Sequence, residues 1–147
     1  MRDMNDTPKG QDASSVHGSI LLVDDDKFLL DMYGMKFTGA GFTVQTCLSA
    51  EEALDALRKG FVADVILFDL VMPEHDGFSF LETRRTENLA PGAILIALTN
   101  QSNDAEKKRA EEFGVEHFIV KASMIPSEVV EVVKKGIAKS NDRNPKA

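Results

Sequence analysis

Five short apolar runs recur along the chain, and a longer amphipathic stretch follows each of them. The runs are six to eight residues long and rich in β-branched and aliphatic residues, which is typical of strands buried in a sheet. We therefore predict five strands, at residues 19–24 (SILLVD), 42–47 (FTVQTC), 63–70 (ADVILFDL), 93–99 (AILIALT) and 116–121 (EHFIVK).

The stretches between these runs predict helices. Ser49, followed three residues later by Glu52, forms a capping-box pattern at the start of one of them. Pro126 suits the first turn of the last one, where its missing N–H costs nothing. The predicted helices cover residues 26–38, 49–59, 78–88, 103–114 and 126–139.

The spacing of apolar residues predicts which face of a helix is buried. On the helix at 103–114, which is otherwise polar and charged, the inward candidates are Ala105, Ala110 and Phe113. On the helix at 26–38, the residues that we expect to face the core are Phe28, Leu29, Met32 and Met35.

The strict alternation of five strands with five helices predicts an α/β fold. Such a chain forms a doubly wound parallel sheet with right-handed crossovers and with helices on both faces. Binding sites in these folds lie at the carboxyl ends of the strands. Residues capable of chemistry should therefore collect at the strand ends.

They do collect there, and most of them are acids. The predicted strands end in Asp24, Asp25 and Asp26, in Asp69, in Thr99 and in Lys121, whereas the second ends near Cys47. Like charges repel, and a buried carboxylate is costly unless a cation offsets it. The cluster of acids after LLV therefore predicts a cation site.

Composition and charge remove several classes of function. The length of 147 residues suits one domain, and the formal net charge of -7 disfavours direct nucleic-acid binding. We find no apolar run long enough to span a bilayer and no secretory signal at the N-terminus, and the chain has a single cysteine. We therefore expect a cytoplasmic protein, with polar flexible tails at residues 1–17 and 141–147 around a domain at 18–140.

In their order and at their strand ends, the segments LLVDDD, ILFDLVMPEHDG, ALTN and FIVK resemble the receiver domain of bacterial two-component response regulators. The likeness covers about residues 18–140 and is closest to stand-alone, chemotaxis-type receivers. It implies a flavodoxin-like (βα)5 fold with strand order 2-1-3-4-5. It also implies that Asp69 takes a phosphoryl group from a histidine kinase or a histidine phosphotransfer protein.

The resemblance also assigns roles to the other strand-end residues. Asp24, Asp25, Asp69 and the backbone carbonyl of Val71 would ligate Mg²⁺, which prefers oxygen ligands. Thr99 and Lys121 would hold the phosphoryl oxygens, and Phe118 would occupy the aromatic switch position. For Asp26 and Asp76 we favour helix capping over metal binding.

Ala122 and Asn100 depart from the usual receiver pattern. Ala122 replaces the proline that commonly follows the lysine with a cis bond, and such a bond before a non-proline residue costs about 2.5–4 kcal/mol. Asn100 replaces a small residue. Val71 and Gln101 occupy positions that tune phosphoryl lifetime, and the apolar Val71 favours slow autodephosphorylation.

The resemblance implies a stand-alone switch that acts through protein–protein contact and catalyses only its own phosphorylation and dephosphorylation. The expected contact surface is the helix at 103–114, the strand at 116–121 and the helix at 126–139, with the chain monomeric or transiently dimeric. One alternative is a degenerate receiver that binds partners without phosphorylation. A haloacid-dehalogenase-type phosphatase would need an acid where Val71 stands, and in a mononucleotide binder DDDKF would repel the phosphate.

Overall fold

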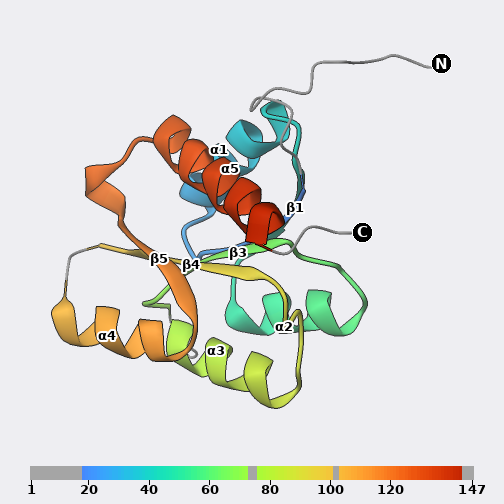
Figure 1. Cartoon of the computed structure of the whole chain (residues 1–147), viewed down its shortest axis with the longest axis vertical. Helices are drawn as coiled ribbons and strands as arrows, with labels where there is room; N and C mark the ends of the chain where they lie inside the picture. Colours follow the sequence, from blue (N-terminus) through green and yellow to red (C-terminus); the bar gives the residue numbers. More distant parts are fainter. Residues whose placement is uncertain (1–17, 73–75, 101–102, 144–147) are drawn as a thin grey trace.

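The computed structural model describes residues 18–72, 76–100 and 103–143, and its core is a parallel five-stranded sheet (Figure 1). The strand order is β2-β1-β3-β4-β5, which confirms the predicted α/β fold. All five strands lie within one or two residues of their predicted bounds. They are β1 (Ser19–Val23), β2 (Thr43–Cys47), β3 (Val65–Asp69), β4 (Ile94–Thr99) and β5 (Val115–Val120).

The helices follow the predicted alternation. They are α1 (Lys27–Gly39), α2 (Ala50–Arg58), α3 (Gly77–Thr86), α4 (Asp104–Glu112) and α5 (Pro126–Arg143), with a short 3₁₀ helix, η2 (Lys121–Ser123), after β5. Side chains cap the first four helices, and the caps include Asp26 and Asp76, as predicted. The predicted end of the last helix at residue 139 is wrong, because α5 continues to Arg143 and enters the segment assigned to the C-terminal tail.

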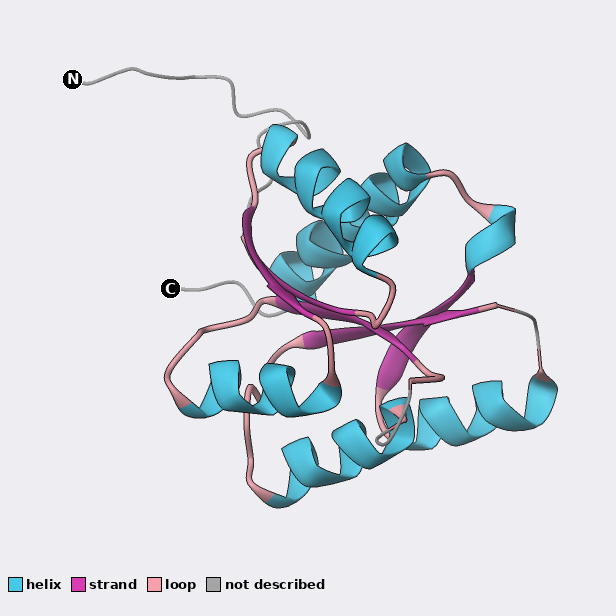
Figure 2. Cartoon of the chain, turned by 180° about the vertical axis from the view of Figure 1, so that it is seen from behind, coloured by secondary structure: helices cyan, strands magenta, loops and turns pink. Residues whose placement is uncertain are grey.

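The helices form two layers around the sheet. α1 and α5 cover one face, and α2, α3 and α4 cover the other (Figures 1 and 2). Alternate residues of each strand point to opposite faces, so Val65 and Leu67 of β3 pack in the core beneath α1 and α5, whereas Ile66 and Phe68 pack against α2 and α3. The sheet therefore separates two apolar cores.

The structure corrects the buried face of α1. Phe28 and Met35 are 79% and 76% exposed, whereas Leu30, Tyr33 and Phe37 are buried against β1 and α5. Both sets of residues have helical spacing. The direction in which the chain leaves β1 and enters α1 decides which set faces the sheet. The prediction is therefore wrong for Phe28 and Met35, whereas Leu29 and Met32 are half-buried and Leu29 packs against this core.

The face predicted for the polar helix is partly confirmed. Ala110 is fully buried and Phe113 packs against the core beneath α3, but Ala105 is exposed. Two cation–π contacts, Arg85 with Phe113 and Arg109 with Phe78, complete the attachment of α4 to α3. α4 is therefore held by aromatic and guanidinium contacts more than by an aliphatic stripe.

Among the described helices, none is long and apolar enough to cross a membrane.

Candidate functional site at the carboxyl edge of the sheet

Three carboxylates meet where the central strands end. Asp24 follows β1, Asp25 is the next residue, and Asp69 is the last residue of β3. One carboxylate oxygen from each lies within 4.8 Å of the others. Asp24 and Asp69 are only 3% exposed, whereas Asp25 is open to solvent. The sequence-based prediction that these acids converge is confirmed.

Lys121 reaches this cluster from the end of β5. Its Nζ lies 2.9 Å from Oδ2 of Asp24, and it donates a hydrogen bond of 3.1 Å to Oδ2 of Asp69. The side chain is 16% exposed, so both ion pairs are largely screened from water. The sequence predicted that Lys121 holds phosphoryl oxygens, but it did not predict this direct pairing with the acids.

Burial dominates the electrostatics of Asp69. It raises the pKa of this carboxyl above its ordinary value, although the Val71 N–H and the Lys121 ammonium both act to lower it. Burial also acts to lower the pKa of Lys121, but its close contacts with the carboxylates of Asp24 and Asp69 outweigh this effect and raise that pKa. At Asp69, the effect of burial therefore exceeds the compensation from this one ammonium.

The donor set fits a hard divalent cation. Oδ1 of Asp24 accepts the backbone N–H of Asp26. Oδ2 is buried and makes no well-directed hydrogen bond, because its contact with Lys121 satisfies the distance for an ion pair but not hydrogen-bond geometry. A buried carboxylate oxygen with spare acceptor capacity, beside two further carboxylates, matches the all-oxygen preference of Mg²⁺. This cluster can hold a metal ion.

Val71 and Gly77 hold the backbone close to Asp69. Oδ1 of Asp69 accepts the N–H of Val71 at 3.0 Å, and the Gly77 N–H donates to the Leu70 carbonyl at 2.8 Å. A Cβ atom at Gly77 would lie 2.8 Å from the Leu70 Cα and 2.9 Å from the Asp69 carbonyl oxygen. Only glycine allows α3 to approach the phosphoacceptor candidate this closely. This role of Gly77 was not predicted from the sequence, although the Asp-Gly pair at 76–77 is its visible signal.

Thr99 and Phe118 lie on the opposite face from Asp69. Residues 95 and 97 of β4 face the α3 and α4 core, and so by alternation does Thr99, which is 2% exposed. Ala97 pairs with Phe118, and Thr99 pairs with Val120 two residues further along β5. The structure thus places Thr99 at the end of the strand beside that of Asp69, and Phe118 one side-chain layer below Thr99.

The structure describes Ala122 and Asn100, the two positions that depart from the receiver pattern. All peptide bonds among the described residues are trans, so the Lys121–Ala122 bond is trans and the chain enters η2 there. Asn100 is exposed at the end of β4. Gln101 lies outside the described residues.

Comparison with known proteins agrees with this geometry. Residues 20–134 match the response regulator receiver domain family. The chain belongs to that family. It is 25% identical to a CheY-like receiver from Methanospirillum hungatei, with a TM-score of 0.73 over 85% of this chain and 98% of that one. CheY4 of Vibrio cholerae gives a TM-score of 0.74 at 25% identity, covering 82% of this receiver and 98% of that chain.

The curated relatives are longer than this receiver. It is 36% identical over 103 residues to the transcriptional regulatory protein GlrR of Escherichia coli, which covers 69% of this chain and 22% of that protein. It is 29% identical over 128 residues to AfsQ1 of Streptomyces coelicolor, covering 84% of this chain and 55% of that protein. The chain therefore spans only part of the length of these regulators.

Proposed function

We propose that this receiver accepts a phosphoryl group on Asp69 from a phosphohistidine of a histidine kinase or of a histidine phosphotransfer protein. The observation that carries the proposal is the site itself. Asp69 is a buried carboxylate at a strand end, one ammonium lies 3.1 Å from it, and two further acids have oxygens within 4.8 Å. This is the charge arrangement that phosphoryl transfer requires, because that reaction depends mainly on positioning and neutralisation of charge.

In the transfer, a carboxylate oxygen of Asp69 forms a bond to phosphorus as the bond from phosphorus to the histidine nitrogen breaks. The Val71 N–H already holds Oδ1 at 3.0 Å, and this contact fixes the carboxylate for attack through its other oxygen. Lys121 lies within reach of that second oxygen and would transfer its hydrogen bonds to the incoming phosphoryl oxygens. The Thr99 hydroxyl would bind another phosphoryl oxygen.

We propose Mg²⁺ as the cofactor, held by Asp24, Asp25, Asp69 and the backbone carbonyl of Val71. When bound, the ion would neutralise the negative charge that otherwise repels an anionic phosphoryl group from an acidic site. Asp24 and Asp69 would present buried oxygens to it, and Asp25 would present an exposed one. The raised pKa of Asp69 supports the proposal, because burial of this carboxyl outweighs the opposing effect of Lys121 and a cation would stabilise the ionised form.

The output of the switch would be protein–protein contact through α4, β5 and α5. Phosphorylation would draw Thr99 toward Asp69 and so free space for Phe118. Phe118 lies on the same face of the sheet as Thr99 and packs against the core beneath α3 and α4. Phenylalanine has no hydroxyl, so this coupling would act through packing. The ligand would shift an existing balance between two conformations, and would not create a new one.

Intact mass after incubation with acetyl phosphate and Mg²⁺ tests the proposal. One phosphoryl adduct is expected in the wild type, none in Asp69→Asn and none after EDTA is added first. Glu111→Gln, an exposed change on α4, is the matched control and should retain the adduct. If the wild type takes no adduct from acetyl phosphate or from any phosphohistidine donor, then this chain is a degenerate receiver and the proposal is wrong.

A further inference from the structure

The two edges of the sheet differ in how well they are protected. Among the described strands, β2 and β5 lie at the edges, and β2 pairs with β1 alone. β5 has an extra residue relative to β4 at Glu116, and that residue is charged and exposed; both features discourage pairing with a further strand. β2 has the sequence TVQTC, without a charge or a proline, and its register with β1 is regular. The edge at β2 therefore lacks the protection that the edge at β5 has.

The hydrogen bonds at the two ends of β2 show which of its backbone groups face outward. Thr43 donates its N–H to the carbonyl of the residue before β1 at 2.9 Å, and the Cys47 carbonyl accepts the N–H of the residue after β1 at 3.1 Å. Successive residues of a strand point their backbone groups to opposite sides. The N–H and C=O groups of Val44 and Thr46 therefore face away from β1.

This outward-facing segment is closed at both ends. The preceding outward N–H, that of Phe42, donates to the Phe37 carbonyl at 3.0 Å. The following one, that of Leu48, donates to Oε1 of Glu52 at 2.9 Å. A strand that pairs with this edge therefore has the groups of two residues to satisfy.

A second copy of β2 satisfies them in full. If two β2 strands lie antiparallel about a two-fold axis at Gln45, Val44 of each copy faces Thr46 of the other, and the two residues exchange N–H···O=C bonds. The Thr46 carbonyl accepts the side-chain amide of Gln45 at 3.5 Å, a long bond whose loss costs little. The outward groups of both copies are then all paired.

The charges of α2 favour the same arrangement. α2 packs beside β2 and runs in the opposite direction. The exposed acids Glu51 and Glu52 lie in its first turn, and Arg58 and Lys59 lie at its end. The two-fold axis brings two α2 helices side by side and antiparallel, so the acidic end of each lies toward the basic end of the other. Arg58 already pairs with Glu87 at 2.7 Å, so Lys59 is the base for the other copy's acids.

We propose that two copies of this chain associate through β2, with an antiparallel β2–β2 ladder that joins their sheets. Gln45 of one copy lies directly opposite Gln45 of the other, and Glu51 of each lies near Lys59 of the other. The ladder is a few residues long, so the interface is small and the dimer is weak.

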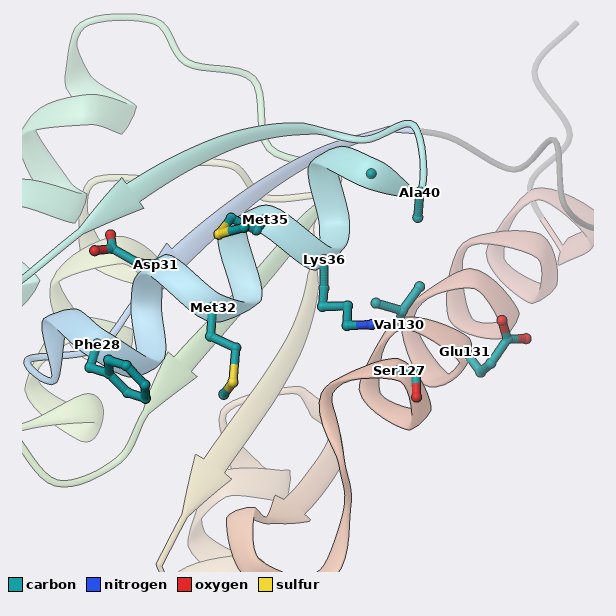
Figure 3. Close-up of a pocket in the computed structure, with 10 residues that line it drawn as sticks. Phe28, Asp31, Met32, Met35, Lys36, Ala40, Ser127, Val130 and Glu131 are labelled. Atoms are coloured by element: carbon teal, nitrogen blue, oxygen red, sulfur yellow. The ribbon is translucent and has the colours of Figure 1, made fainter.

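This surface is separate from the others described. The apolar groove of about 900 Å³ between α1 and α5 receives no residue from β2 (Figure 3). β5 is at the opposite edge of the sheet, so association through β2 leaves β5 and α4 open. The inference does not depend on phosphorylation of Asp69, and its test uses the unphosphorylated chain.

Sedimentation equilibrium of the full chain over about 10 to 500 μM tests the proposal, because this range brackets weak interfaces. The average mass of the wild type should rise toward that of a dimer. Gln45→Lys puts two like charges directly opposite each other and should weaken association about fivefold or more. Glu111→Gln makes the same change in net charge on an exposed position of α4 and should associate as the wild type does. A wild type that stays monomeric throughout, or a Gln45→Lys chain that associates as the wild type does, overturns the proposal.

A proline tests the hydrogen bonds of the ladder. Thr46→Pro removes an outward N–H and leaves the bonds to β1 in place, and proline is tolerated at such positions of edge strands. This variant should remain folded in urea unfolding but should associate at least about tenfold more weakly, since the missing N–H is lost from both sides of the ladder. A folded Thr46→Pro chain that associates as the wild type does would exclude the ladder, and if it does not fold, Gln45→Lys still decides.

Exchange of charges tests the antiparallel direction. Glu51→Lys and Lys59→Glu each make both α2 cross-pairs repulsive, and each should weaken association roughly two- to fivefold. Their equimolar mixture should associate as strongly as the wild type, since both cross-pairs are then attractive. A mixture that associates no better than its components contradicts the arrangement.

A cysteine at the two-fold axis tests the register. Opposite residues that share no hydrogen bonds in an antiparallel pair have Cα atoms about 4.5 Å apart, within the range of a disulfide. Gln45→Cys should therefore crosslink two copies when the chain is oxidised with diamide, and Glu116→Cys on β5 should not. Cys47 does not compete, because it is 1% exposed and burial, followed by the nearby Glu52, raises its pKa to about 12. If Gln45→Cys forms no more crosslink than Glu116→Cys, the proposal is wrong.

Discussion

The close approach of α3 to the site predicts a large effect from a single methyl group. Gly77 is buried, and an added Cβ would lie 2.8 Å from the Leu70 Cα and 2.9 Å from the Asp69 carbonyl oxygen. Both neighbours are backbone atoms, so neither can move aside by changing rotamer. Gly77→Ala must therefore displace either the start of α3 or the residues that carry the Asp69 carboxylate.

The size of the effect follows from these contacts. Carbon atoms normally meet at about 3.5–4.0 Å, so the new Cβ would lie at least about 0.7 Å too close to the Leu70 Cα, and it would also crowd the Asp69 carbonyl oxygen. Overpacking of this kind costs about 1–3 kcal/mol, and alanine in the first turn of a helix recovers less than about 1 kcal/mol. We expect a net loss of about 1–2 kcal/mol, or a fall in Tm of roughly 3–8 °C for a domain of this size.

Thermal unfolding and the rate of adduct formation from acetyl phosphate measure the two consequences. Gly77→Ala should unfold earlier and take the phosphoryl group at least about tenfold more slowly, since a 1 Å misplacement near the chemistry costs on the order of 100-fold. Gly92→Ala is the matched control, because its Cβ would meet no atom within 4 Å. If Gly77→Ala melted and reacted like Gly92→Ala, the close approach of α3 would not matter and the reasoning would fail.

Three further predictions concern the acidic site. Burial raises the pKa of Asp69 in the folded chain, so ionisation of this carboxyl lowers the free energy of unfolding. The loss is absent below the ordinary pKa of about 3.9, where the carboxyl is protonated in both the folded and the unfolded chain. It is complete above the raised pKa of the folded chain. Asp69→Asn should therefore be more stable than the wild type in urea unfolding at pH 7 without metal, and no more stable at pH 3; a gain that persists at pH 3 would have another origin. Lys121→Ala removes the ammonium between two buried carboxylates, and it should lower the free energy of unfolding at pH 7 by about 1–3 kcal/mol, with part of the loss restored by millimolar Mg²⁺. A loss that Mg²⁺ does not reduce would argue against a metal at these acids. The side chain of Val71 is 59% exposed and offers no group to an attacking water, so the phosphorylated chain should dephosphorylate with a half-life of minutes or longer, and Val71→Glu should shorten it; a half-life of seconds in the wild type would contradict this.

The sequence predicted the sheet and its acidic edge well because both depend on local pattern. Buried strands appear as apolar runs, and parallel strands place their carboxyl ends together, so Asp24, Asp25 and Asp69 had to converge. Helix caps such as Ser49 and Asp76 were equally readable, since the capping side chain bonds within three residues.

The buried face of α1 could not be predicted in the same way. The helix carries two apolar stripes, and only the geometry of the β1 exit selects Leu30, Tyr33 and Phe37 over Phe28 and Met35. Long-range contacts were also out of reach. The ion pairs of Lys121 with Asp24 and Asp69 join residues that are 97 and 52 positions apart in the sequence. The close contact between Gly77 and the Leu70 backbone depends on where α3 begins relative to the end of β3.

The division of the apolar interior by the sheet has a practical consequence for engineering. Residues that alternate along one strand belong to two cores without shared side-chain contacts, one beneath α1 and α5 and one beneath α2, α3 and α4. Substitutions in separate cores should add in their effects on stability, whereas substitutions within one core should couple. A redesign could therefore repack Val129 and Val133 to tune one face, while the packing around Phe118 on the other face stays as it is.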